Sequence, residues 1–239
     1  MKLDNLRILN AERARRRAAI LLTELDSGAE RVIGEGDRER GELGEALAGA
    51  MRSGKSGVVE LGGRQYFLNV HVPPPRIVAI GAVHISQALA PIARTAGYDL
   101  EIIDPRTAFA TQERFAGTTL HAEWPELVLR QRPLDRYTAL AALTHDPKID
   151  DAPLVAALKT GCFYVGALGS RKTHGRRRER LLAAGLGEAE INRIAAPIGL
   201  DIAAATPGEI AVAIMAQIIA AFRRRAVAAG PEAERAALP

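Results

Sequence analysis

Hydrophobic and polar residues form short, mixed patterns over the first third of the chain. Residues 3–17 and 39–51 are predicted to be helices, the second because Leu43, Leu47 and Ala50 recur at spacings of three and four. Apolar runs separated by turn residues predict two β-hairpins in the same region. The predicted strands are 18–22 and 30–33, joined by a turn at Asp26-Ser27-Gly28, and 57–61 and 64–72, joined by Gly62-Gly63.

Three consecutive prolines, Pro73 to Pro75, interrupt this pattern. Proline donates no backbone N–H and restricts the residue before it to extended conformations, so we place a domain boundary here. Beyond it, apolar runs alternate with helical segments, which is typical of parallel strands buried on both faces by crossover helices. We therefore predict an α/β fold, with a small α+β N-terminal domain (1–73) followed by a Rossmann-like parallel sheet domain (74–239). Its predicted strands are 76–81, 99–104, 138–144 and 163–168, and its predicted helices are 84–96, 152–160, 172–184 and 207–224.

The last helix carries two signals of its own. Thr206 and Glu209 have the spacing of a capping box that opens the helix. Ile210, Ile214 and Ile218 form an apolar stripe, which could serve a homo-oligomer or pack onto the sheet of the same chain. The Ala-rich segment 226–239 that follows is expected to be a frayed end.

The composition is that of a globular protein. The chain has 239 residues, 48% of them hydrophobic and 25% charged, which excludes collagen-like, coiled-coil and wholly disordered classes. The charged N-terminus and the lack of a run of about 18 apolar residues predict neither a signal peptide nor a membrane span. The single cysteine, Cys162, forms no intramolecular disulfide, which agrees with a cytoplasmic location and with a small buried core residue.

Positive charge is clustered along the chain. Lys and Arg number 32 against 28 Asp and Glu, a formal charge of +4, and much of the excess lies in the stretches 13–17, 171–180 and 223–225. Such stretches can meet phosphates or an acidic partner, although a solvated helix face is the commoner explanation. Only 4% of residues are aromatic, so stacking platforms for nucleic acid are not expected.

The sharpest local feature follows the first strand of the second domain. Gly81 and Ala82 lead into a helix that begins near His84, and a turn of this kind offers backbone N–H groups and the positive helix end to a phosphate. Asp104 ends the next strand, where a carboxylate would reach a ribose-like hydroxyl. Together these segments indicate half of a Rossmann fold.

The dinucleotide fingerprint GxGxxG is incomplete at this turn. Val83 and Ser86 stand where the second and third glycines belong, and the branched side chain of Val83 obstructs close approach of a pyrophosphate. NAD(P) is therefore a weaker prediction than the fold itself. A Rossmann scaffold with no ligand at this turn stays open as an alternative.

Further polar residues are expected at the same sheet edge. His145 and Asp146 follow the third strand, and the carboxyl ends of parallel strands meet at one crevice, where His84 and Asp104 also lie. These residue types make a metal conceivable, but their spacing does not require one and we assign no metal ligand. No catalytic residue is assigned either.

The fourth strand ends in a second glycine-rich turn. Gly166, Gly169 and Ser170 precede a basic helix, and Arg171 offers a planar guanidinium to an oxyanion. This combination predicts a second anion pocket. A tight turn with an N-capping serine and a solvated helix is the alternative.

These motifs resemble the XdhC/CoxI family of xanthine dehydrogenase accessory proteins. The resemblance covers about residues 75–220. It rests on the ordered motifs Gly81-Ala82-x-His84, Asp104-Pro105-Arg106, Thr144-His145-Asp146, Val165-Gly166-x-Leu168-Gly169-Ser170-Arg171-Lys172, Pro197-Ile198-Gly199-Leu200-Asp201 and Thr206-Pro207-x-Glu209-Ile210-Ala211-Val212.

The resemblance implies a chaperone of the molybdenum cofactor (molybdopterin), which carries it as cargo without turnover of its own. Such a protein shields the cofactor during sulfuration by a cysteine desulfurase and helps to insert it into a molybdenum hydroxylase apoenzyme. On this view the cofactor phosphate lies at 81–84 or 169–171, with Asp104, Arg106, His145 and Asp146 near the rest of it.

Two other functions stay open from the residues alone. The first is an NAD(P)-dependent oxidoreductase built on the same Rossmann half, although no Tyr-x-x-x-Lys pair is evident. The second is a scaffold that binds an acidic partner surface through Arg176, Arg177 and Arg178.

Overall fold

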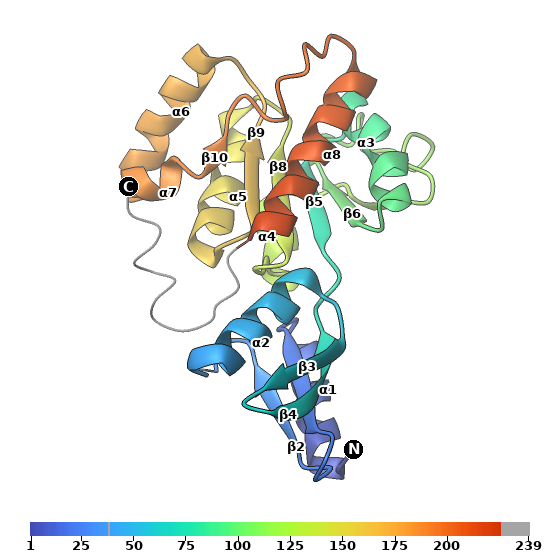
Figure 1. The fold of residues 1–239 in the computed structure, drawn as a ribbon. Helices are drawn as coiled ribbons and strands as arrows, with labels where there is room; N and C mark the ends of the chain where they lie inside the picture. Colours follow the sequence, from blue (N-terminus) through green and yellow to red (C-terminus); the bar gives the residue numbers. More distant parts are fainter. Residues whose placement is uncertain (38, 226–239) are drawn as a thin grey trace. The chain divides into compact units, whose positions relative to one another are not determined.

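The computed structural model describes residues 1–37 and 39–225, and the predicted frayed segment 226–239 lies outside them. The chain divides into two compact units with a break between Pro73 and Pro74 (Figure 1). The second unit extends to Phe222, within the last helix.

The first unit is an antiparallel sheet with two helices. Its strands lie in the order β2-β1-β4-β3, and Gly62 and Gly63 make the β3–β4 turn with φ of +57° and +73°. Leu9 of α1 packs on Ala19 and Leu21, on one face of β1. The elements are α1 (Leu3–Ala14), β1 (Ala19–Glu24), β2 (Glu30–Gly34), α2 (Gly41–Ser53), β3 (Gly57–Leu61) and β4 (Arg64–His71). Both predicted hairpins and both predicted helices are confirmed.

The second unit is a six-stranded sheet whose neighbouring strands are all parallel. The strand order β10-β9-β8-β5-β6-β7 is the Rossmann order, because the chain moves outward from β5 in one direction and then returns to continue from β8 in the other. The elements are β5 (Arg76–Ile80), α3 (His84–Thr95), β6 (Asp99–Ile103), β7 (Thr119–His121), α4 (Pro125–Gln131), β8 (Thr138–Ala142), α5 (Pro147–Thr160), β9 (Tyr164–Ala167), α6 (Arg171–Ala183), α7 (Glu188–Ile191), β10 (Ile194–Ala195) and α8 (Pro207–Arg224).

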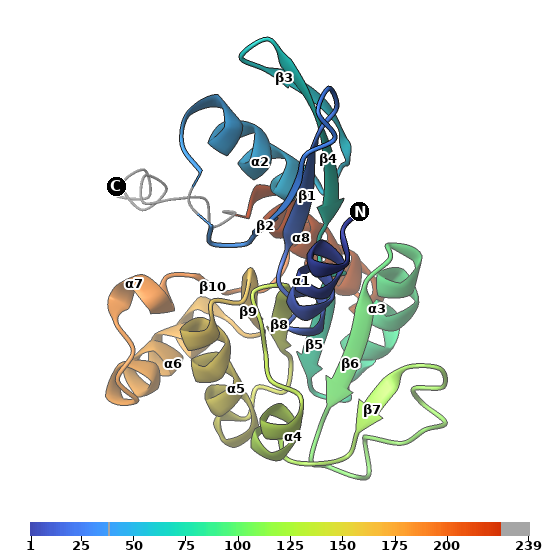
Figure 2. The ribbon, with the colours of Figure 1, turned by 90° about the horizontal axis from the view of Figure 1, so that it is seen from below.

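Helices cover both faces of this sheet. Figure 2 shows α4, α5 and α6 on one side and α3 and α8 on the other. Every residue of β5 and β8 is buried, which is why these strands appear in the sequence as continuous apolar runs. The predicted α/β fold is therefore confirmed, and its switch point lies between β5 and β8.

The sequence prediction missed four short elements, β7, α4, α7 and β10, and began α5 too late. The strands β7 and β10 have three and two residues, and the helices α4 and α7 have seven and four. Segments of this length show no clear periodicity. The helix α5 begins at Pro147 rather than at 152, because Asp146 caps it and proline is well tolerated in the first helical turn.

The last helix packs within the second unit. The predicted capping box is present, because the Thr206 N–H donates to Glu209 Oε2 (2.9 Å) and the Glu209 N–H donates to Thr206 Oγ1 (3.2 Å). Ile214 and Ile218 are fully buried. The apolar stripe of α8 thus covers the sheet, which was one of the two alternatives left open by the sequence.

Candidate functional site

The switch point brings the turn after β5 against the loop after β8. Gly81 has φ of +121°, and a Cβ at this position would lie 2.9 Å from Thr144 Cγ2. A side chain would therefore clash with the neighbouring loop as well as strain the backbone. Glycine at Gly81 is required by the close packing of these two chain segments.

The backbone donors of the turn after β5 are used within the protein. The Gly81 N–H donates to Ile103 O (2.8 Å), the Ala82 N–H to Asp104 Oδ2 (2.7 Å) and the Val83 N–H to Ser86 Oγ (2.9 Å). The sequence predicted that this turn presents free donors to a phosphate. The structure corrects that prediction for these three N–H groups, whereas the His84 side chain is exposed at the start of α3.

Asp104 is a fully buried partner of this turn. Besides the Ala82 N–H, its carboxylate accepts from the Arg106 N–H (2.9 Å), Nε (2.9 Å) and Nη2 (2.7 Å). Burial alone would raise the pKa of Asp104, but these hydrogen bonds outweigh it and lower the pKa below its ordinary value. Both oxygens are engaged inside the protein, so Asp104 orders the turn instead of presenting a free carboxylate to a ribose-like hydroxyl.

The loop after β8 has an unusual backbone. His145 has φ of +68°, which is uncommon for a residue with a side chain, and its imidazole is exposed. Asp146 caps α5 by accepting the Lys148 N–H (2.9 Å). Asp150, one turn further along, accepts from the Thr144 hydroxyl (2.8 Å) and the His145 N–H (3.0 Å), and these bonds hold the loop.

The turn after β9 approaches the same loop. A Cβ on Gly169, whose φ is +128°, would lie 3.1 Å from Thr173 Cγ2 and 3.7 Å from His145 Nδ1. Ser170 caps α6 by accepting the Thr173 N–H (3.2 Å), while the Arg171 side chain is exposed. Gly166 lies inside the sheet, where a Cβ would clash with Ile198 at 2.6 Å, so its absence of a side chain serves packing.

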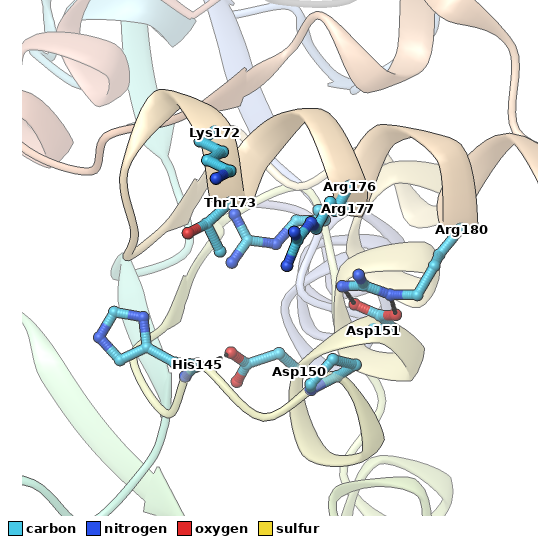
Figure 3. Close-up of a pocket in the computed structure, with 9 residues that line it drawn as sticks. His145, Asp150, Asp151, Lys172, Thr173, Arg176, Arg177 and Arg180 are labelled. Atoms are coloured by element: carbon cyan, nitrogen blue, oxygen red, sulfur yellow. Dashed lines mark hydrogen bonds and ion pairs between the residues drawn. The ribbon is translucent and has the colours of Figure 1, made fainter.

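A cavity of about 390 Å³ lies between the first turns of α5 and the helix α6. Figure 3 shows Arg176 and Arg177 extending from α6 toward Asp150 and His145. Of the predicted site residues only His145 lines this cavity; the others are Asp150, Asp151, Lys172, Thr173, Arg176, Arg177, Arg180 and Pro147. The sequence singled out the arginine-rich stretch but not this face. Lys172, Arg176 and Arg180 recur every four residues, a spacing that places them on one side of the helix.

Asp150 and Arg177 are the buried charged groups of the cavity, with 1% and 2% of their surfaces exposed. Burial raises the pKa of Asp150 to about 6, although hydrogen bonds from Thr144 and His145 and the charge of Arg177 oppose the shift. Burial likewise lowers the pKa of Arg177, against the attraction of Asp150 and Asp151. Neither group was assigned from the sequence, because nothing local indicates that they are buried.

Neither a metal centre nor a reactive thiol is found among the described residues. Within residues 1–37 and 39–225, no group of three His, Cys, Asp or Glu side chains is placed to hold a metal ion. Cys162 is fully buried in the core on the α5 side of the sheet, as predicted, and burial raises its pKa to about 12. A thiolate at Cys162 is therefore strongly disfavoured at neutral pH.

The strand order, the glycine turns at the switch point and the cationic cavity beside it define a Rossmann-type α/β protein with a site suited to an anionic ligand. Residues 77–218, more than half of the 239-residue chain, match the model of the XdhC Rossmann domain. The chain thus belongs to the XdhC family, and the resemblance found in its motifs is confirmed. No helix in the described part of the chain is long and apolar enough to cross a membrane.

Three curated relatives are similar to this chain. It is 29% identical over 223 residues to the uncharacterized protein YqeB of Escherichia coli, covering 85% of this chain and 40% of that protein. It is 31% identical over 156 residues to a probable xanthine dehydrogenase subunit of Bacillus subtilis, covering 65% and 45%. It is 30% identical over 146 residues to the molybdenum cofactor insertion chaperone PaoD of Escherichia coli, covering 61% and 40%. The chain spans less than half the length of each.

A solved structure shares the fold. The crystal structure described as a xanthine dehydrogenase from Bacillus halodurans superposes with a TM-score of 0.62, covering 95% of this chain and 66% of that one. The two sequences are 21% identical, so the likeness supports the architecture alone.

Proposed function

We propose that this chain is an accessory protein that carries the molybdenum cofactor as cargo for a hydroxylase of the xanthine dehydrogenase or CO dehydrogenase type. The observation that carries the proposal is the XdhC Rossmann domain over residues 77–218, together with 30% identity to a protein named as a molybdenum cofactor insertion chaperone. The chain shields the cofactor during sulfuration by a cysteine desulfurase and hands it to the hydroxylase apoenzyme in the cytoplasm.

The chemistry of the site supports a cargo of this kind. Molybdopterin has a phosphate at one end and polar ring atoms at the other, and the carboxyl ends of β5, β8 and β9 offer exposed groups of matching character. His84, Arg106, His145 and Arg171 are the proposed contacts with the cargo, since each side chain is exposed or partly exposed. Gly81, Ala82, Asp104, Asp146, Gly166, Gly169 and Ser170 give the surrounding turns their shape through the bonds and close contacts described above.

The sulfur that the cofactor receives must come from another protein. Cys162 is the single cysteine of the chain and is fully buried with a raised pKa. A buried thiol of this kind is a poor carrier of transferable sulfur. The cysteine desulfurase is therefore proposed to act on the bound cofactor directly, with this chain as the holder.

The test is cofactor retention by the protein purified from a host that makes molybdenum cofactor. We expect molybdopterin to co-purify, and His84→Ala to retain less of it. Lys159→Ala is the matched control, because Lys159 is exposed at the far end of α5, away from the carboxyl ends of the strands. Loss of hydroxylase activity on deletion of the chain in its own host completes the test. Absence of bound pterin together with normal hydroxylase activity would contradict the proposal.

Titration with NADH separates this function from that of an oxidoreductase. The Ala82 and Val83 N–H groups, which would face a pyrophosphate, already have partners. We expect no heat of binding in calorimetry. Saturable NADH binding would favour the oxidoreductase instead.

A further inference from the structure

The cavity between α5 and α6 contains a buried cation with unused hydrogen-bond donors. Arg177 is 2% exposed, and its Nη2 donates to Leu168 O at 2.9 Å. Its Nε and Nη1 are buried and have no hydrogen-bond partner. A guanidinium carries five N–H donors, and a buried one normally has them paired, so these free donors call for an acceptor.

Asp150 does not supply that acceptor. Its two oxygens accept from Thr144 Oγ1 and from the His145 N–H, on the opposite wall of the cavity. Among the ion pairs within 4.0 Å in residues 1–37 and 39–225, none joins Asp150 to Arg177. The two charges attract each other but leave the space between the walls for a further group.

Two exposed cations stand on the same side of α6. Lys172 and Arg176 line the cavity, and within the described chain neither has an acceptor in an ion pair or hydrogen bond. Arg180, the next residue in this series, is already held by Asp151 through Nε (2.6 Å) and Nη2 (3.1 Å). Four cations and two carboxylates give the cavity a formal charge of +2.

A solvated basic helix face does not explain this arrangement. Arg178, on another side of α6, fits that description, because it is partly exposed and pairs with Glu188 and Asn192. Arg177 is buried beside it, and desolvating a guanidinium without pairing its donors is unfavourable. The cavity thus has the features of a site built for an anion.

We propose that this cavity binds a tetrahedral dianion of the phosphate or phosphate monoester class, with Arg177 as its buried anchor and Lys172 and Arg176 at its mouth. Guanidinium groups match the paired oxygens of a phosphate, and the +2 charge balances a dianion. The Thr173 side chain lines the same space, and its hydroxyl lies 3.1 Å from Ser170 Oγ. The site does not depend on the proposed cargo, since free phosphate and the phosphate of a pterin present the same group.

Calorimetric titration of the full chain with inorganic phosphate at low ionic strength tests the site. We expect saturable 1:1 binding that Arg176→Gln weakens about tenfold, the loss of one charge-assisted contact. Arg176 is exposed, so this variant should fold normally. Arg178→Gln is the matched control and should bind phosphate as the unmodified chain does.

Two results overturn the proposal. One is the absence of saturable phosphate binding; the other is equal weakening by Arg176→Gln and Arg178→Gln, which would indicate only a diffuse positive surface. A chain that retains molybdopterin but fails this phosphate test would leave the proposed function standing and remove the site.

The source of the phosphate is decided by comparing retained molybdopterin in the same variants. If the pterin supplies the anion, Arg176→Gln retains less of it and added phosphate displaces it. If free phosphate is the ligand, retention is unaffected while the titration still shows the tenfold loss. Both results support the site and differ in what occupies it.

Discussion

The turns after β5 and after β9 both join a buried parallel strand to a helix through glycine, yet their surroundings use hydrogen-bond donors in opposite ways. After β5, the N–H groups of Ala82 and Val83 are taken by Asp104 and Ser86. Beside the turn after β9, Arg177 keeps two guanidinium nitrogens without partners. A glycine-rich turn therefore does not by itself locate an anion site, because nearby side chains decide whether donors remain free.

The largest effect is expected from breaking the satisfied turn. Asp104→Ala should lower the free energy of unfolding by about 3 kcal/mol, because the Ala82 N–H and the Arg106 guanidinium lose a buried acceptor. Urea denaturation of the whole chain measures it. Asp201→Ala, at an exposed position, is the control and should change stability by less than about 0.5 kcal/mol. Equal stability of the two variants would show that the turn does not need its carboxylate.

The next effect sharpens the comparison through pH, because Asp150 and Asp104 have pKa values shifted in opposite directions. The folded pKa of Asp150, about 6, lies above its ordinary 3.8, so the folded chain holds a proton that the unfolded chain releases. Its stabilising contribution is complete below pH 3.8 and is lost as the pH rises through about 6.

Asp150→Asn removes this titration. The stability of the variant relative to the unmodified chain should therefore rise by about 2 to 3 kcal/mol between roughly pH 4 and pH 8. Urea midpoints at a series of pH values test this. Asp151→Asn, the neighbouring carboxylate, should not reproduce the rise; if it does, Asp150 is not the titrating group.

A smaller effect is expected at the helix that follows β9. Ser170 caps α6 with its side chain, whereas Val83, at the corresponding position of α3, cannot. Ser170→Ala should cost about 1 kcal/mol of stability. Val83→Ala is the comparison and should cost less, since no capping bond from its side chain is lost. Thermal unfolding of both variants decides whether the serine serves the helix.

The smallest change in stability is expected at the most buried cation. Arg177→Met should alter the free energy of unfolding by less than about 1 kcal/mol, because the arginine already leaves donors unpaired and Asp150 can take up a proton. The same variant should lose phosphate binding. A loss of stability as large as that of Asp104→Ala would mean that Arg177 holds the fold rather than a ligand.

Much of the fold could be predicted because it depends on local pattern. The strands β5, β6, β8 and β9 are continuous apolar runs, and the capping box at Thr206 and Glu209 is a spacing of three residues. The strands β7 and β10 could not be predicted in this way. They have three and two residues, and they exist because a neighbouring parallel strand provides hydrogen-bond partners.

The candidate site was predicted in part for a similar reason. Strand ends placed His84, Asp104 and His145 at one edge of the sheet. Local sequence could not show that Asp104 turns inward to Ala82 and Arg106, or that Arg177 is buried while Arg178 is not. Burial and the free or paired state of a donor are set by distant segments.

The sequence by itself determined the α/β class, the motifs of the XdhC family and a basic stretch at residues 171–180, since periodicity, turn residues and charge are properties of neighbours along the chain. Only the tertiary structure decided which of these charges line a cavity. Packing α6 against α5 buries Arg177 opposite Asp150, and desolvation then shifts the pKa of both groups. Desolvation depends on what surrounds a side chain in space, so it follows from the fold and not from the local sequence.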